Sequence, residues 1–288
     1  MNLTILYRGP LSSCNYGCRY CPFAQQREDC LAHAHDAQAL ERFVAWVAAQ
    51  KQHTIALFFT PWGEALIHRR YQQAIAALTQ LPHVVKVAIQ TNLSCRLDWV
   101  ATCVTHRLGI WATYHPSQVS RERFLAHCTE LVQHRVRLSV GMVGMQEHLD
   151  EIETMRRILP LPIYLWVNAY KRIPNYYTAD QIVLLNRIDP LFHFNLHYHR
   201  SQGLACHCGD SVVAVAGDGT VCRCHFVPEP IGNIYQQGWE QALQPRVCPN
   251  QTCGCHIGYV HMPQLQLYDC FGSGILERSP DHVSIIGL

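Results

Sequence analysis

LTILYR (Leu3–Arg8) and CNYGCRYCPF (Cys14–Phe23) follow one another near the start of the sequence. The first is an apolar run typical of a strand, and the second places Cys14, Cys18 and Cys21 at spacings of four and three residues. Structural zinc sites and cuboidal iron–sulfur clusters usually take four protein ligands, so three close thiols leave one metal position open. This pattern directly after a strand predicts a metal cluster that can bind a small molecule; a zinc site is the alternative.

The composition argues against several classes of partner. The chain has 288 residues, of which 15% are charged, and its formal net charge of +2 gives no reason to expect a nucleic-acid or membrane partner. The start is not typical of a signal peptide and no apolar run could span a bilayer, so we expect a cytoplasmic protein. Fifteen cysteines, eight of them between Cys206 and Cys270, then indicate metal or cluster ligation rather than disulfides.

Apolar runs alternate with helical patterns along the first two thirds of the chain. The predicted strands cover 3–8, 54–59, 84–90, 109–114, 137–143 and 163–168; the predicted helices cover 37–50, 70–80, 97–105, 120–134, 147–158 and 178–188, the last with Thr178 as N-cap. This alternation predicts an α/β fold with a parallel sheet, a partial (β/α)6 TIM-like barrel. Its chemistry is expected at the carboxyl ends of the strands, where Cys14 lies.

The pattern changes near residue 195. Cys206–Phe226 predicts a β-hairpin that turns at Asp218-Gly219, and a helix-poor, cysteine-rich stretch follows. We therefore predict a barrel domain over 1–194 and a small C-terminal cysteine-rich β-hairpin domain over 195–288. Eight thiols exceed the need of one tetrahedral zinc ion, although a zinc site stabilising a small domain is the alternative. The cysteines outside both groups are expected to be small buried hydrophobes: Cys30, Cys95, Cys103 and Cys128.

The C-x3-C-x2-C motif after the first strand of a partial barrel resembles the radical S-adenosylmethionine (SAM) superfamily. The resemblance implies that Cys14, Cys18 and Cys21 hold a [4Fe–4S] cluster with an open iron, which the amino and carboxylate groups of SAM chelate. Tyr20 matches the position beside the adenine. Reductive cleavage of SAM would give methionine and a 5′-deoxyadenosyl radical that abstracts a hydrogen atom from the substrate.

The resemblance also makes the later strand ends candidates for SAM binding. TPWGEAL (Thr60–Leu66) matches a Gly-Gly-Glu element at Gly63 and Glu64, with Trp62 in place of the first glycine; a plain loop acid is the alternative role of Glu64. MVGMQE (Met142–Glu147) resembles an I-x-G-x-x-E element, in which Met142 would pack on adenine or in the core. The other candidates are Gly144 at the following turn, Thr91 and Asn92 for the ribose or carboxylate, Thr113 and Asn168 for the cavity, and His115, either a catalytic residue or one held by a backbone carbonyl.

The tail resembles the SPASM/twitch appendages of radical SAM enzymes. Cys208, Gly219 and Cys224 fit the opening of that signature, whereas the later cysteine spacings depart from it. The resemblance implies one auxiliary [4Fe–4S] cluster, with a second as the alternative. The expected ligands are Cys208, Cys224, Cys253 and Cys255, with Cys206, Cys222 and Cys248 as spare candidates.

Appendages of this type imply modification of a peptide or protein side chain. A flavodoxin or ferredoxin would supply the electron, and a separate protein would recognise any leader peptide, because Cys14 lies so near the start of the chain. Radical dehydrogenation, carbon–carbon bond formation or rearrangement of a small-molecule metabolite is the alternative. A non-catalytic iron–sulfur electron carrier or zinc module is the alternative from another class.

Overall fold

The parallel sheet predicted from the alternating pattern is present. A computed structural model describes residues 1–21 and 29–281 of the chain. Six strands pair in parallel in the order of the sequence, and strand β4 is buried at every position but its last, as expected when both faces of a sheet are covered. The strands are β1 (Asn2–Arg8), β2 (Thr54–Phe59), β3 (Val84–Thr91), β4 (Leu108–Thr113), β5 (Arg137–Val143) and β6 (Tyr164–Asn168).

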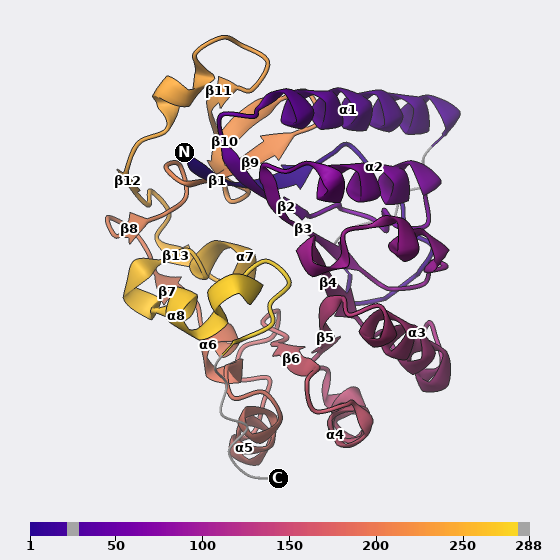
Figure 1. Cartoon of the computed structure of the whole chain (residues 1–288). Coiled ribbons are helices and arrows are strands. Elements are labelled where there is room, and N and C mark those ends of the chain that lie inside the picture. Colours follow the sequence, from indigo (N-terminus) through magenta and orange to yellow (C-terminus); the bar gives the residue numbers. More distant parts are fainter. Residues whose placement is uncertain (22–28, 282–288) are drawn as a thin grey trace.

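Helices cover the outer face of this sheet. They are α1 (Cys30–Ala49), α2 (Arg69–Gln80), α3 (Arg121–Gln133), α4 (Leu149–Ile158) and α5 (Ala179–Ile188). Thr178 and Gln181 form a reciprocal capping box at the start of α5, which confirms the predicted N-cap. Figure 1 shows α1, α2 and α3 on one side of the sheet and the C-terminal helices on the other. Within the described residues, we find no helix with the length and apolar character needed to cross a membrane.

The helix predicted over 97–105 is wrong. The segment instead forms two short 3-10 turns, Asp98–Thr102 and Thr105–Arg107. The backbone N–H of Cys103 bonds the carbonyl of Val100, three residues back, and the N–H of Val104 donates to Thr79 Oγ1 at 3.0 Å. Because the Thr79 hydroxyl takes this N–H, the α-helical ladder does not continue.

The predicted hairpin forms and extends the barrel sheet. Strands β9 (Val212–Ala216) and β10 (Thr220–Cys224) turn at Gly219, whose φ of +87° favours glycine, and β11 (Val227–Asn233) follows. Strand β9 pairs with β1 in parallel, and β10 and β11 add antiparallel strands, so the sheet has nine strands in all. The division into two domains near residue 195 stays a prediction, but the sheet itself is continuous across it.

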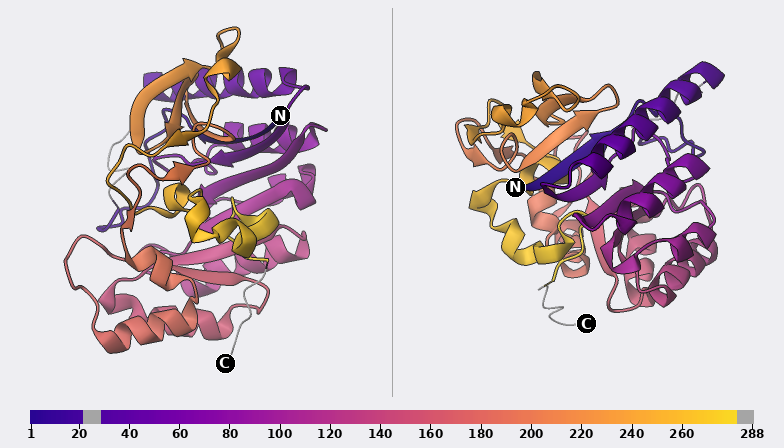
Figure 2. Two further views of the ribbon diagram at one scale, coloured as in Figure 1. Left: turned by 90° about the vertical axis from the view of Figure 1, so that its left-hand side faces the viewer. Right: turned by 45° about the horizontal axis from the view of Figure 1, so that its top comes forward.

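Short elements of the tail cover the concave face of the sheet (Figure 2). Ile257 and Leu276 from the tail pack against Leu6, Phe58 and Trp111 from the strands, in an apolar cluster separate from the larger one under the helices. The elements of the tail are α6 (Phe192–Leu196), β7 (His199–Arg200), β8 (Ala205–Cys206), β12 (Arg246–Val247), β13 (Thr252–Cys253), α7 (His256–Tyr259) and α8 (Leu267–Phe271). The partial barrel is therefore closed from inside by its own C-terminal chain.

Glu277 anchors this closing segment. Its side chain is fully buried, and its Oε1 accepts from Lys86 Nζ at 2.8 Å and lies 3.3 Å from Arg137 Nε. Its backbone carbonyl accepts from the Ser139 hydroxyl at 2.5 Å. A Cβ on Gly109 would lie 2.9 Å from Glu277 Oε2, so the glycine leaves room for the carboxylate.

We expect Glu277→Gln to lower the free energy of unfolding by about 3 kcal/mol, because the partly buried Lys86 and Arg137 lose the buried carboxylate between them, although Arg137 keeps its ion pair with Asp281. Urea unfolding followed by circular dichroism measures this change. Glu122→Gln, at an exposed position of α3, is the matched control and should leave the stability within about 0.5 kcal/mol of the wild type. Equal stability of the two variants would contradict the anchoring role of Glu277.

Candidate functional site

The loop that carries Cys14, Cys18 and Cys21 is held against the carboxyl ends of β3 and β4. Asn92 Nδ2 lies 3.7 Å from Cys14 Sγ and donates to Asn15 Oδ1 at 3.0 Å. The backbone N–H of Gly17 donates to Gln118 Oε1 at 2.9 Å. The loop is thus fixed by side chains that follow other strands, as expected of a site at this end of a parallel sheet.

The thiols of the loop influence one another. Burial, followed by the charges of Cys21 and Cys14, raises the pKa of Cys18 to about 11, although a hydrogen bond from Tyr20 opposes the shift. Burial also raises the pKa of Cys14. Without metal these two thiols are protonated at neutral pH, so any metal they bind must displace their protons.

Gly63 lets the loop after β2 approach the cysteine loop closely. A Cβ at this position would lie 1.8 Å from the backbone oxygen of Ser13, which no side chain could accommodate. The next residue, Glu64, donates its N–H to the same oxygen at 3.0 Å. Gly63 is therefore required by the packing of two loops, whether or not a ligand also contacts it.

The carboxylate of Glu64 points inward and connects the loop after β2 with the end of β3. It accepts from Thr91 Oγ1 at 2.8 Å, from the backbone N–H of Asn92 at 2.5 Å and from that of Leu66 at 3.0 Å. Only 2% of Glu64 is exposed, and burial raises its pKa to about 7 against these three hydrogen bonds. Its contact with SAM stays a prediction; the interaction that the structure gives it is with the backbone.

His115 and Tyr20 lie together at the carboxyl end of β4. The Tyr20 hydroxyl is 2.8 Å from His115 Nδ1, and the two rings stack with centroids 5.8 Å apart. Burial, followed by the charge of His148, lowers the pKa of His115 to about 4, so its imidazole is neutral at pH 7. The partner of His115 is thus the Tyr20 side chain of the cysteine loop, rather than the backbone carbonyl considered above.

The remaining SAM candidates divide between the surface and the core. Thr113 is half-buried and Asn168 is exposed, each at the end of its strand. Gly144 has no room for a side chain, because a Cβ would lie 2.7 Å from the Tyr177 hydroxyl. Met142 is completely buried with Val140 on the helix-facing side of β5, so it has no exposed surface on which adenine could pack.

Five tail cysteines line one small cavity. Arg223, Phe226 and Met262 complete part of its wall. Hydrogen bonding from the Cys208 thiol lowers the pKa of Cys206 and of Cys224, and the charges of Cys224 and Cys206 act on Cys253. The lining cysteines are Cys206, Cys208, Cys224, Cys248 and Cys253.

Two of the other predicted ligands lie elsewhere. Cys222 lines a different cavity, which it shares with Cys224, and its Sγ is 3.4 Å from the carbonyl of Pro228. Cys255 caps the start of α7 and does not line the cavity of the five cysteines. The chain turns from β13 into α7 between Cys253 and Cys255, so these neighbouring cysteines diverge.

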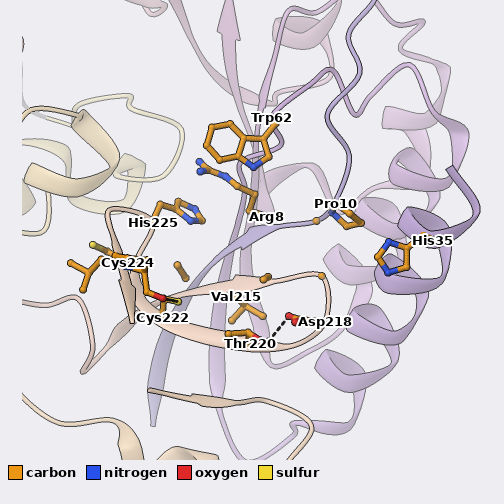
Figure 3. A pocket seen from close by; sticks show the side chains of 16 residues that line it. Arg8, Pro10, His35, Trp62, Val215, Asp218, Thr220, Cys222, Cys224 and His225 are labelled. Carbon is orange, nitrogen blue, oxygen red and sulfur yellow. Dashed lines mark hydrogen bonds between the residues drawn. The ribbon is translucent and has the colours of Figure 1, made fainter. Parts of the chain in front are cut away.

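The cavity that includes Cys222 has a volume of about 480 Å³ and lies between the end of β1 and the β9–β10 hairpin. Figure 3 shows Arg8, Trp62 and His225 gathered along one side of it, with Cys222 and Cys224 near His225. The Arg8 guanidinium stacks over the Trp62 ring at 4.1 Å. This cavity therefore connects the segment before the cysteine loop with the tail cysteines.

Among the described residues, no three His, Cys, Asp or Glu side chains converge as the ligands of a single metal ion do. Each cysteine ligand of a [4Fe–4S] cluster binds a different iron, so such ligands surround a larger volume than the ligands of one metal ion. Arg223, which lines the cavity of the five cysteines beside Cys206, was not among the predicted site residues, because no motif in the sequence marks it. Cys30 is exposed, so its predicted burial was wrong; Cys95 and Cys128 are buried as predicted, and Cys103 is only partly buried.

Comparison with known proteins finds the fold but no close relative. No protein-family model and no curated protein sequence matches the chain. The structure of native anSMEcpe with bound AdoMet and Cp18Cys peptide matches with a TM-score of 0.55 and 15% identity, over 83% of this chain and 80% of that one. The form with Kp18Cys peptide gives a TM-score of 0.56 and 11% identity, over 83% and 80%. The predicted α/β partial barrel is therefore confirmed, and it is similar in fold to structures that hold AdoMet.

Glu64 should make the stability of the protein depend on pH. Because its pKa rises from 4.5 to about 7 on folding, the folded state keeps a proton that the unfolded chain releases. This contribution is complete below pH 4.5 and is lost as the pH rises through about 7, a loss of about 3 kcal/mol. We expect Glu64→Gln to remove this part of the slope in urea unfolding, whereas Glu41→Gln, an exposed control, should keep it. An unchanged slope in Glu64→Gln would contradict the assignment.

Proposed function

We propose that the protein is a radical SAM enzyme whose catalytic [4Fe–4S] cluster is bound by Cys14, Cys18 and Cys21. The observation that carries the proposal is a three-thiol loop, fixed at the carboxyl ends of parallel strands, in a fold similar to AdoMet-bound anSMEcpe. Among all residue types, cysteine thiolates are the usual ligands of such clusters. Three of them leave one iron for the amino and carboxylate groups of SAM.

The residues around the loop fit both a cluster bound by the three cysteines and the adenine of SAM. The amide of Asn92 lies beside Cys14 Sγ, where it can donate to a thiolate, and the N–H of Tyr16 reaches the same sulfur at 3.4 Å. The stacked rings of Tyr20 and His115 offer an aromatic surface for the adenine. Thr91, Thr113, Gly144 and Asn168 stay proposed contacts of SAM.

The cofactors would supply the difficult chemistry: a reduced cluster with bound SAM yields methionine and a 5′-deoxyadenosyl radical. The chain's own residues orient the groups. Glu64 fixes the backbone of Asn92, and Asn92 in turn positions Asn15 and Cys14. His115, neutral and hydrogen-bonded to Tyr20, keeps the aromatic ring of the loop in place.

We further propose that the tail cysteines bind one auxiliary [4Fe–4S] cluster. Cys206, Cys208, Cys224 and Cys253 line one cavity and influence one another's pKa, which favours them as the four ligands, with Cys248 as the alternative in the same wall. Cys206 thus replaces Cys255 in the ligand set proposed from the sequence. Arg223 adds a buried cation next to Cys206, suited to an anionic cluster.

The proposed substrate is a side chain of a peptide or protein. The support is that anSMEcpe, which is similar in fold, has been solved with a bound peptide. A flavodoxin- or ferredoxin-type protein is the proposed electron donor, and a separate recognition protein would present any leader peptide. The cavity of about 480 Å³ beside Arg8 and Trp62 is the proposed place for the modified segment.

Anaerobically reconstituted, dithionite-reduced protein should convert SAM into 5′-deoxyadenosine, as chromatography of the products would measure. Gly63→Ala should lower this yield at least about tenfold, because its Cβ would displace Ser13 and with it the cysteine loop. Gly17→Ala is the matched control on the same loop, since a Cβ there meets nothing within 4 Å. Failure of the wild type to release 5′-deoxyadenosine would remove the proposed activity.

Iron analysis separates the two proposed clusters. Cys208→Ala should lose about four irons per chain, the content of one cluster, and keep the cluster of the N-terminal loop. Cys222→Ala, on the same hairpin but lining another cavity, should keep the full iron content. Equal iron loss in both variants would contradict the proposed ligand set.

A further inference from the structure

The cavity of about 480 Å³ at the end of β1 has one strong cation in a largely apolar wall. Among its described lining residues, Arg8 is the only lysine or arginine and Asp218 is the only carboxylate. Cavities of about 300–1,000 Å³ with apolar walls and a few polar groups are typical of ligand sites, and the polar groups fix the orientation of the ligand. The apolar part of the wall includes Pro10, Ala214, Val215, Ala216, Val227 and Pro228.

The Arg8 guanidinium is fixed at one side of this cavity. Arg8 leaves β1 on the same face as Leu6, which packs on the concave side of the sheet. Its Nε–H donates to the carbonyl of Thr60 at 2.9 Å, and its guanidinium carbon lies 4.1 Å from the centroid of the Trp62 ring. Figure 3 shows Arg8 with Trp62 on one side and His225 on the other. The cation therefore has a defined position before any ligand binds.

Trp62, which stands in place of the first glycine of the Gly-Gly-Glu element, connects Arg8 with the cysteine loop. The next residue, Gly63, packs against the backbone of Ser13, and Glu64 donates its N–H to the carbonyl of Ser13 at 3.0 Å. One short loop after β2 thus holds both the cation and the start of the cysteine loop. A ligand bound to this cation would lie at a fixed position relative to that loop, as the orientation of a substrate requires.

The guanidinium of Arg8 lacks an anionic partner. No carboxylate of the described residues forms an ion pair with it within 4.0 Å. Asp218 Oδ1 accepts instead from the backbone N–H of Thr220 at 2.9 Å. Burial lowers the pKa of Arg8 to about 10, so the group keeps its charge at neutral pH. A partly buried cation without a counter-charge favours the binding of an anion.

We propose that the Arg8 guanidinium binds a carboxylate of the substrate in this cavity, with Trp62 as the aromatic surface that holds the guanidinium in place. The inference rests on the proposed function, in which this cavity takes the segment to be modified. Because Nε bonds Thr60, the two terminal nitrogens remain for a ligand, and their planar pair of N–H groups matches the two oxygens of a carboxylate. A phosphate ester carries up to about two charges and would find no second lysine or arginine in the described wall.

Peptide binding tests the inference and separates two sources of the carboxylate. The probes are acetyl-Leu-Gly-Leu with a free C-terminus, the same peptide as its C-terminal amide, and acetyl-Leu-Glu-Leu amide, all radiolabelled. Equilibrium dialysis against reconstituted protein without SAM gives the affinities. We expect one acid to bind about tenfold more tightly than the neutral amide, the value of one charge-assisted pair. Preference for the first peptide indicates a C-terminal carboxylate, and preference for the third an acidic side chain.

Variants assign the preference to the guanidinium. In Arg8→Gln the acid should bind no more tightly than the amide. Arg8→Lys keeps the charge but loses the planar fork, so it should keep a smaller preference. Arg157→Gln, an exposed control on α4, should bind the acid as the wild type does. Unchanged binding of the neutral amide shows that each variant is folded.

The fluorescence of Trp62 shows whether the charge lies in this cavity. Trp62 is exposed, and the other five tryptophans of the chain are partly or fully buried. Iodide is an anionic quencher and acrylamide a neutral one, so the ratio of their quenching constants reports the charge beside the ring. We expect Arg8→Gln to lower this ratio about twofold, with the acrylamide constant unchanged, and the bound acid to protect the wild type from iodide.

Three outcomes would overturn the inference: acids and amide that bind alike, a preference for the acid that survives in Arg8→Gln, or an iodide ratio that Arg8→Gln leaves unchanged. Release of 5′-deoxyadenosine, measured on the same reconstituted sample, decides the proposed function separately. SAM cleavage without a preference for the acid removes only the carboxylate site. A preference for the acid without SAM cleavage removes only the radical activity.

Discussion

The arrangement of the candidate site depends on the buried carboxylate of Glu64. It holds the backbone at the end of β3 through Thr91 and Asn92, while the N–H of the same residue bonds the Ser13 carbonyl directly before the cysteine loop. Gly63 makes this approach possible, because any Cβ there would overlap Ser13. Three successive strand ends are thus joined by one short segment, and the loop with three thiols receives a defined position. Removing a carboxylate from water is costly, but a buried carboxylate that accepts three hydrogen bonds strongly restricts the positions of the three donors.

A second constraint acts from the opposite side of the sheet. The C-terminal chain returns through the open side of the partial barrel and places Glu277 between Lys86 and Arg137, with Arg278 on the adjacent tryptophans. The same stretch of chain packs Ile257 of α7 into the apolar cluster of Leu6 and Phe58. The hairpin that carries Cys222 and Cys224 joins the sheet beside β1, so the tail cysteines and the N-terminal cysteine loop belong to neighbouring strands. Two sites far apart in the sequence therefore share one rigid support.

Much of this architecture could be predicted from the sequence, because periodicity is a local property. The six strands and four of the six helices lie within two residues of their predicted bounds, and the Asp218-Gly219 turn is present. Helix α1 is also present, but it begins at Cys30 rather than at Ala37. The helix over 97–105 failed because a distant hydroxyl, that of Thr79, takes a backbone donor. The role of Met142 depended on the face of β5 that its side chain occupies. Ser139 bonds Trp166 on the concave face, and side chains alternate along a strand, so Met142, three residues further on, faces the helices. The side chain of Cys255 does not line the same cavity as that of Cys253, because the chain turns between the two residues. The pairing of β9 with β1 and the Glu277 ion pairs join residues far apart in the chain, which no local pattern reports.

The open iron is the claim on which the proposed chemistry depends, and electron paramagnetic resonance tests it most directly. A variant with Ala at Cys208, Cys224 and Cys253 would remove the auxiliary cluster and leave the signal of the N-terminal one. The g values of the reduced, reconstituted variant should shift when SAM is added, because SAM becomes a ligand of one iron. A spectrum that stays unchanged at saturating SAM would contradict the open iron.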